Sequence, residues 1–185
     1  MANKRVVATT GLPGAGKGLF SEVASLFNIP VFVCGDVIRE ETRKIGMPLT
    51  RANTGAVMLR IREEEGPTVI SKRLIPKIDA SGCDTVLVEG VRNLEETEEL
   101  RLRYGNVTLI GIHASPQTRF ERLRARGRED DPMTWEEFES RDKRELNVGL
   151  GKVVALADEM LVNEGTVEEF QNVAQTILEL VLPYG

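Results

Sequence analysis

The chain has 185 residues, of which 41% are hydrophobic and 29% are charged, as in an ordinary globular domain. Its net charge of −5 disfavours nucleic acid and anionic membranes as partners, and no apolar run approaches the about 20 residues of a membrane span. The start of the chain leads directly into a predicted strand and leaves no room for a signal peptide. We therefore expect one cytoplasmic domain over residues 1–185, either a monomer or a homodimer.

Short apolar segments alternate with segments of helical pattern along the whole chain, which is typical of a parallel sheet covered by helices on both faces. Helix starts are marked by capping-box spacing at Asn93, Thr134 and Thr166, and by proline after Ser115. The predicted strands are Arg5–Thr10, Val31–Cys34, Thr85–Glu89, Val107–His113 and Glu159–Asn163.

The first predicted strand is followed at once by the sequence GLPGAGKG and then by an amphipathic segment. This sequence matches the phosphate-binding loop G-x-x-x-x-G-K, in which backbone N–H groups and a helix N-terminus surround a phosphate. Lys17 would reach the β- and γ-phosphates as a point charge, which makes it a catalytic candidate. A merely structural glycine-rich turn is the disfavoured alternative. The predicted nucleotide-binding residues are Gly11, Leu12, Pro13, Gly14, Ala15, Gly16, Lys17, Gly18 and Leu19.

The loop departs from the general motif directly after its lysine. A serine or threonine normally follows there and ligates Mg²⁺, whereas this chain has Gly18 and Leu19. The sequence resembles the G-x-P-G-x-G-K-G loop of adenylate kinases without the threonine that follows it in that family. We therefore expect Mg²⁺ to be held by phosphates, water and acids elsewhere.

About 50 residues separate the second and third predicted strands, more than one crossover needs. Breaks at Gly46–Pro48 and Gly66–Pro67 predict several helices, and we expect residues 35–82 to form an acceptor-binding insertion. The segment GDVIR at its start is similar to the G-D-x-[IL]-R segment of adenylate kinases. This resemblance implies that Asp36 and Arg39 bind the substrate, with the arginine on the acceptor's phosphate. Alternatively, Asp36 caps a helix and Arg39 is solvated.

The third predicted strand ends in the sequence VEGVR, which is similar to the D-G-F-P-R segment of adenylate kinases with one residue fewer. An acid that ends an apolar strand beside the P-loop strand is well placed to organise Mg²⁺, so Glu89 is the predicted metal-site residue, acting through water. The resemblance implies that Arg92 binds the acceptor's anionic group. The alternative is that Glu89 merely ends the strand.

Five arginines lie within residues 119–128 of this acidic chain, a local pattern that suits a small anionic ligand. The polar stretch GREDDP interrupts two arginine-bearing helices, and we expect residues 119–144 to form a lid. The arrangement resembles the lid of nucleoside monophosphate kinases, which implies catalytic roles for Arg122, Arg126 and Arg128 on the γ-phosphate. Solvated pairing with neighbouring glutamates is the alternative, and we prefer it for Arg124.

Near the C-terminus, residues 157–169 look like the A-D-x-V-I-x-N-x-G-x-x-E-E end of dephospho-CoA kinases. This resemblance implies that Asn163 and Gly165 line the base of the nucleotide through backbone contacts. A strand and turn leading into a capped helix would explain the same residues almost as well.

Taken together, the motifs resemble an archaeal family of adenylate kinase-related nucleotide kinases. The resemblance implies a P-loop kinase fold, a five-stranded parallel sheet of order 2-3-1-4-5 with helices on both faces. It also implies transfer of the γ-phosphoryl group of ATP or GTP, with Mg²⁺, to a small acceptor, most simply a nucleoside monophosphate. Two alternatives stay open: a dephospho-CoA kinase-like enzyme, in which Asp36 would act as a base, and a nucleotide-binding switch ATPase.

Overall fold

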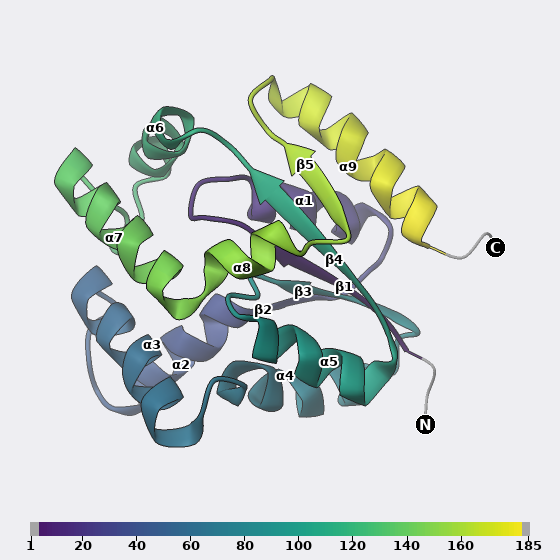
Figure 1. Ribbon diagram of the computed structural model, residues 1–185, viewed down its shortest axis with the longest axis horizontal. Coiled ribbons are helices and arrows are strands. Elements are labelled where there is room, and N and C mark those ends of the chain that lie inside the picture. The colour runs from purple at the N-terminus through teal and green to yellow at the C-terminus, as the bar shows by residue number, and fades with distance from the viewer. Residues whose placement is uncertain (1–3, 183–185) are drawn as a thin grey trace.

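A five-stranded parallel sheet of order β2-β3-β1-β4-β5 forms the centre of the molecule (Figure 1). The computed structural model describes residues 4–182, so both ends of the predicted domain, 1–3 and 183–185, lie outside the described residues. The strands are β1 (Arg5–Thr10), β2 (Val31–Val33), β3 (Thr85–Glu89), β4 (Asn106–His113) and β5 (Glu159–Val162). The predicted order and strands are confirmed, with differences of one residue: β2 ends before Cys34, β4 starts at Asn106, and β5 ends before Asn163.

The sheet is buried on both faces because its central strand, β1, is apolar on both sides. Val6 and Ala8 of β1 belong to one core, and the intervening Val7 belongs to the other. The helices are α1 (Lys17–Leu26), α2 (Cys34–Lys44), α3 (Arg51–Glu65), α4 (Val69–Ala80), α5 (Leu94–Tyr104), α6 (Pro116–Arg126), α7 (Trp135–Val148), α8 (Leu150–Ala155) and α9 (Val167–Val181).

Each core is closed by a different set of helices. The first core contains buried residues of α2, α3, α4, α5 and α8, whereas α1 and α9 supply the helical part of the second. In Figure 1, α9 lies along one side of the sheet beside α1, and α4 and α5 lie on the opposite side. Within residues 4–182, no helix combines the length and the apolar character that crossing a membrane requires.

The helix starts follow the predicted capping residues at three of the four sites. Thr166 and Glu169 form a complete capping box, while Asn93 and Thr134 each accept a hydrogen bond from the backbone N–H three residues on. Ser115 precedes Pro116 at the start of α6, but its hydroxyl bonds to the side chains of Thr118 and Glu164 instead of capping the helix.

The helices of the segment predicted as an insertion end near the expected glycines. α2 ends at Lys44 before Gly46, and α3 ends at Glu65 before Gly66. The third helix of the segment, α4, packs against α5 and contributes four buried apolar residues to the first core, namely Val69, Ile70, Leu74 and Ile78. Of the helices in this segment, α3 is joined to the arginine-bearing helix α7 by the salt bridge between Arg51 and Glu137.

A buried carboxylate, Glu96 of α5, joins α3 to the loop after β3. One of its oxygens accepts a hydrogen bond from Arg62 Nη2 of α3 at 2.6 Å, and the other accepts one from the backbone N–H of Arg92 at 2.8 Å. The Glu96 side chain is fully buried and that of Arg62 is 10% exposed. This buried ion pair therefore fixes the backbone of Arg92, one of the predicted substrate-binding residues.

Replacing Glu96 with alanine should destabilise the fold by about 3–5 kcal/mol, because it leaves the Arg62 charge buried without its partner. Urea unfolding followed by circular dichroism measures the effect. The exposed Glu95 of the same helical turn is the matched control, and Glu95→Ala should cost no more than about 1 kcal/mol. Equal losses in the two variants would show that the buried pair contributes nothing beyond a helix-end charge.

Candidate active site

A cleft of about 640 Å³ opens beyond the ends of β1 and β3. The P-loop, the start of α2, the end of β3 and the segment around α6 form its walls. Most of the predicted site residues line it: Pro13, Gly14, Gly16, Lys17, Gly18, Leu19, Asp36, Arg39, Glu89, Arg92, Arg122, Arg126, Arg128 and Asn163. Gly11, Leu12, Ala15 and Gly165 are the predicted residues that do not line it. These four walls and Asn163, which follows β5, thus meet in one cleft.

The P-loop has a backbone path that only glycine follows without strain at three of its positions, Gly11, Gly14 and Gly16. Gly14 has φ of 84° and Gly16, which caps the start of α1, has φ of 116°. A Cβ atom on Gly14 would lie 2.7 Å from the carbonyl oxygen of Arg119, and one on Gly16 would overlap the side-chain amide of Asn163. The glycines therefore allow neighbouring segments to pack directly against the loop.

Lys17, the first residue of α1, folds back over the loop that precedes it. Its Nζ donates hydrogen bonds to the carbonyl oxygens of Gly11 at 2.6 Å and Leu12 at 3.2 Å. Burial lowers the pKa of Lys17 to about 8, although nearby Glu89 acts in the opposite direction. A phosphate group at this position would favour the charged form of the lysine and compensate for its lost hydration.

Asn163, just after β5, supports the P-loop through a hydrogen bond to the loop backbone. This buried side chain donates its amide to the carbonyl oxygen of Ala15 at 2.9 Å. Arg122 of α6 donates in turn to the backbone oxygen of Asn163 at 3.0 Å and to its Oδ1 at 3.2 Å. The side chain of Asn163 thus supports the P-loop, a role that differs from the predicted backbone contact with the nucleotide base. Gly165 is exposed and lies outside the cleft lining.

The acidic stretch between α6 and α7 holds the predicted lid arginines to different extents. Asp131 accepts two hydrogen bonds from the Arg126 guanidinium, at 2.9 and 2.5 Å, and one from the backbone N–H of Arg128. Arg141 of α7 donates to Asp130 and Asp131. Arg122 is held by Asn163, whereas within residues 4–182 the side chain of Arg128 forms neither a salt bridge nor a hydrogen bond, so Arg128 is the predicted lid arginine without a partner.

Arg119 has a structural role that the sequence did not reveal. Its guanidinium is buried, forms a bidentate pair with Asp142 of α7 at 2.9 and 2.6 Å, and donates to the carbonyl oxygen of Pro13 at 3.2 Å. It also lies over the ring of Phe138, 4.8 Å from its centroid. Arg119 therefore ties α7 to the P-loop. Its pairing with an acid 23 residues away has no local signal in the sequence.

Glu89 lies in the cleft wall with its carboxylate fixed by a serine of α1. Ser21 Oγ donates to Glu89 Oε2 at 2.6 Å, and the serine is buried. Sequence reasoning missed Ser21, although it lies one helical turn after Lys17 on the same face of α1. The chain therefore places a hydroxyl beside the acid, although it lacks the hydroxyl that normally follows the P-loop lysine.

The donors in this wall suit a hydrated Mg²⁺ better than a tightly ligated metal. No group of three or more histidines, cysteines or acids that could hold a metal occurs among residues 4–182. Mg²⁺ prefers oxygen ligands and keeps several of its waters, so one carboxylate together with nucleotide phosphates is a fitting set. Glu89, oriented by Ser21, is the residue that would contact this hydrated ion.

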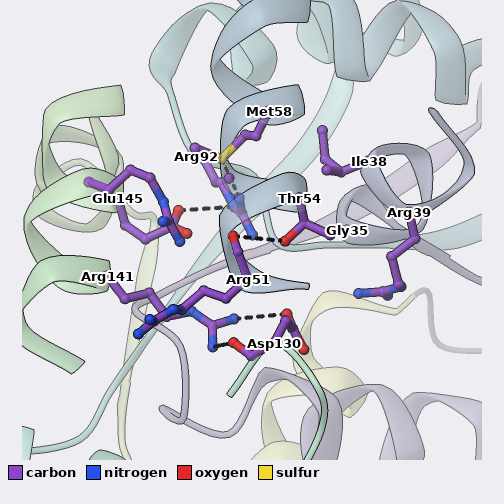
Figure 2. Close-up of a pocket in the computed structure, with 12 residues that line it drawn as sticks. Gly35, Ile38, Arg39, Arg51, Thr54, Met58, Arg92, Asp130, Arg141 and Glu145 are labelled. Atoms are coloured by element: carbon purple, nitrogen blue, oxygen red, sulfur yellow. Dashed lines mark hydrogen bonds and ion pairs between the residues drawn. The ribbon is translucent and has the colours of Figure 1, made fainter. Parts of the chain in front are cut away.

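The two predicted acceptor-side arginines are held differently. Arg39 pairs with Asp36 of the same helix, at 3.0 Å from Nε and 2.5 Å from Nη2, and this aspartate is largely exposed. Arg92 Nε lies 3.3 Å from Glu145 of α7, and its Nη1 contacts the sulfur of Met58 at 2.8 Å (Figure 2). Arg92 is therefore the better fixed of the two.

Comparison with known proteins identifies the family. A sequence profile described as an AAA domain matches residues 10–139. A UPF0200 protein of Hyperthermus butylicus is 45% identical over 184 residues, covering 100% of this chain and 98% of its own. A UPF0200 protein of Pyrococcus abyssi is 43% identical over 184 residues, which cover 97% of this chain and 98% of the Pyrococcus protein. The chain belongs to the UPF0200 family.

Solved structures similar to this UPF0200 chain share its fold at low sequence identity. The protein TT1252 from Thermus thermophilus has a TM-score of 0.68 at 18% identity, with 97% of this chain and 99% of the other covered. A gluconokinase from Sinorhizobium meliloti 1021 has a TM-score of 0.60 at 16% identity (98% and 95% covered). A shikimate kinase from Acinetobacter baumannii, in complex with shikimate, has 0.58 at 17% (97% and 94% covered). The UPF0200 chain therefore has a P-loop kinase-like fold, and these likenesses do not single out adenylate kinases.

Replacing Ser21 with alanine should raise the Mg²⁺ concentration needed for tight ATP binding about fivefold, because Glu89 loses a hydrogen bond worth about 1 kcal/mol. Titration of a fluorescent ATP analogue at several Mg²⁺ concentrations measures the shift. Ser21→Thr keeps the hydroxyl and should resemble the unmodified protein. Ser25, whose hydroxyl bonds only to the helix backbone, supplies the control Ser25→Ala. An unchanged Mg²⁺ requirement in Ser21→Ala would show that the serine does not orient Glu89 for the ion.

Proposed function

We propose that this UPF0200 protein is a nucleotide-dependent kinase of the cell interior that transfers the γ-phosphoryl group of ATP or GTP to a small anionic acceptor. The observation that carries the proposal is the meeting of Lys17, Arg39 and Arg92 in one cleft of about 640 Å³. A nucleotide-binding lysine and two separate arginines are more than nucleotide hydrolysis requires. They suit a reaction in which two anionic molecules are held together.

Each group of cleft residues would have a separate role in phosphoryl transfer. Lys17 would neutralise charge on the β- and γ-phosphates, while Arg122, Arg126 and Arg128 would meet the charge that develops on the transferred group. Glu89 would orient a hydrated Mg²⁺, which supplies neutralisation of the triphosphate when bound. Arg39 and Arg92 would align the acceptor. Catalysis would thus consist of positioning and electrostatic stabilisation, without a covalent protein intermediate.

The candidate acceptors come from the sequence resemblance and from the fold neighbours. The sequence resemblance to adenylate kinase-related enzymes implies a nucleoside monophosphate, and the titles of two fold neighbours name a gluconokinase and a shikimate kinase. A dephospho-CoA kinase-like reaction would need Asp36 as a base, but this carboxylate is paired with Arg39. A monomer or homodimer remains a prediction from the sequence.

A coupled ADP-release screen tests the proposal directly. We expect one member of a set of nucleoside monophosphates, dephospho-CoA and small hydroxy acids to accelerate ADP release well above acceptor-free hydrolysis. Hydrolysis that no acceptor accelerates would instead favour a switch ATPase, the reading that the missing P-loop hydroxyl supports.

Replacing Lys17 with methionine should reduce phosphoryl transfer more than tenfold while leaving the fold intact, because the lysine bonds only to backbone oxygens of the loop. ADP release and circular dichroism measure the two properties. The affinity of the unmodified protein for ATP should also fall as the pH rises through about 8, where free Lys17 loses its proton. Exposed Lys72 supplies the control Lys72→Met. Normal turnover in Lys17→Met would contradict the role of the P-loop.

Replacing Arg39 or Arg92 with alanine should raise the KM for the acceptor about ten- to a hundredfold, the usual value of a charge-assisted hydrogen bond. Acceptor-free hydrolysis should hardly change. The effect should be larger for Arg92, which is fixed by Glu145 and by its backbone bond to Glu96.

Steady-state kinetics with and without acceptor distinguish the possible roles of these arginines. Arg60→Ala, at an exposed position of α3, is the control. Equal losses of acceptor-dependent and acceptor-free activity in the Arg39 and Arg92 variants would assign both arginines to the nucleotide and contradict the acceptor site.

A further inference from the structure

A small second cavity of about 40 Å³ adjoins the cleft where α2, α3 and α7 approach one another (Figure 2). Five of its residues also line the cleft, namely Gly35, Arg39, Arg92, Asp130 and Arg141. The others lie farther from the P-loop side, and they are Ile38, Arg51, Thr54, Gly55, Met58, Arg144 and Glu145. We call this cavity the arginine pocket. Since Lys17 lines only the cleft, the pocket extends the cleft on its acceptor side.

The arginine pocket contains more positive than negative groups. Five arginines line it, against the two acids Asp130 and Glu145. These acids already interact with Arg141 and Arg92, at 3.3 Å in each case. Arg51 pairs at 2.8 Å with Glu137, which lies outside the pocket lining. Arg39 likewise pairs with Asp36, outside the pocket lining. Among residues 4–182, the protein's own acids therefore leave one of the five guanidinium groups, that of Arg144, without a salt bridge.

Arg144 of α7 is the guanidinium with the fewest partners. In the part of the chain between residues 4 and 182 it forms no salt bridge, and its Nε is buried without a hydrogen-bond partner. Burial lowers the pKa of Arg144, and the neighbouring Arg141, Arg92 and Arg51 lower it further, against the opposing effect of Glu145. The side chain of Arg141, which is 8% exposed, also has an Nε without a partner.

The opposite wall of the pocket leaves room for the Arg144 side chain. A Cβ atom on Gly55, in the second turn of α3, would lie 2.8 Å from Arg144 Nη1. Glycine is unfavourable inside a helix by about 1 kcal/mol relative to alanine. The glycine therefore accommodates this guanidinium at some cost to helix stability.

The size and chemistry of the pocket suit a small oxyanion. A volume of about 40 Å³ holds a few water-sized atoms, about the size of a carboxylate or phosphate group. Only Ile38 and Met58 contribute larger apolar side chains, and no aromatic ring is available to stack on a base. Guanidinium groups bind carboxylates and phosphates through paired hydrogen bonds.

We propose that the arginine pocket binds a compact oxyanion, a carboxylate or a phosphate, at the end of the acceptor away from the atom that receives the phosphoryl group. The proposal rests on the proposed kinase function and narrows its substrate class. The acceptor is a small molecule with a phosphorylatable group at one end and an anionic group at the other. Nucleoside monophosphates, whose far end is a base, do not meet this requirement.

The first experiment tests the pocket without any phosphoryl transfer. Inorganic phosphate is titrated by calorimetry into protein saturated with a non-hydrolysable ATP analogue and Mg²⁺, so that the P-loop is already occupied. We expect phosphate to bind, and Arg144→Met to weaken its binding about ten- to a hundredfold. Arg144→Lys keeps the charge but not the paired N–H donors of the guanidinium, so its affinity for phosphate should lie between those of the unmodified protein and Arg144→Met. Lys143→Met, at the exposed neighbouring position, should bind like the unmodified protein.

The second experiment identifies the source of the anion. ADP release is measured with three sets of acceptors: small hydroxy carboxylates, phosphate monoesters of small polyols, and nucleoside monophosphates. We expect a member of the first or second set to be used, with a KM that Arg144→Met raises about ten- to a hundredfold at unchanged acceptor-free hydrolysis. Use of nucleoside monophosphates alone would overturn the proposal. So would an Arg144→Met variant whose phosphate affinity and acceptor KM equal those of the unmodified protein. If the unmodified protein does not bind ATP, the proposed function itself is overturned.

Discussion

The cleft depends on two side chains from the second half of the chain that hold carbonyl oxygens of the P-loop. Asn163 donates to Ala15 at 2.9 Å, and Arg119 donates to Pro13 at 3.2 Å. A glycine-rich loop loses much conformational entropy on ordering, so it needs fixed partners to keep its N–H groups directed toward a phosphate. These partners follow β4 and β5, and β4 pairs directly with β1. The parallel sheet thus brings the loop and its supports to the same edge.

The remaining charges of the cleft are arranged around this support. Guanidinium groups at close range repel one another, and the protein separates them with its own acids. Asp131 holds Arg126 and Arg141, Asp142 holds Arg119, and Glu145 faces Arg92. An anionic ligand can instead bind the guanidinium that these acids leave without a salt bridge among residues 4–182, that of Arg144.

The features that sequence predicted correctly are those encoded by neighbouring residues. The P-loop is one contiguous motif after an apolar strand, and the five strands follow from short apolar runs. The sheet order follows from the family resemblance that the motifs carry, and the structure has that order. Most of the residues predicted for the site also line the cleft, because the ends of parallel strands meet at one edge, but Gly11, Leu12, Ala15 and Gly165 do not.

Pairings between distant residues could not be predicted in this way. Ser21 and Glu89 are 68 residues apart, and nothing in the local pattern of either residue indicates the other. The contact of Arg144 with Gly55 likewise depends on how α7 approaches α3. Asn163 was placed beside the nucleotide from a resemblance, whereas its amide reaches the loop backbone because β5 lies next to β4. Strand neighbours can be inferred from a motif, but helix packing at this resolution of detail cannot.

The buried carboxylate of Glu96 has a consequence for redesign of the molecule. It bonds to Arg62 on α3 and to the backbone of Arg92, whose side chain faces Glu145 on α7. Three elements far apart in the sequence therefore converge on a single arginine. An engineer who exchanged Arg92 would keep the bond to Glu96, because the donor is a backbone N–H, but would leave the buried Glu145 carboxylate without the guanidinium that faces it. A change of specificity at this position would therefore have to include Glu145 on α7.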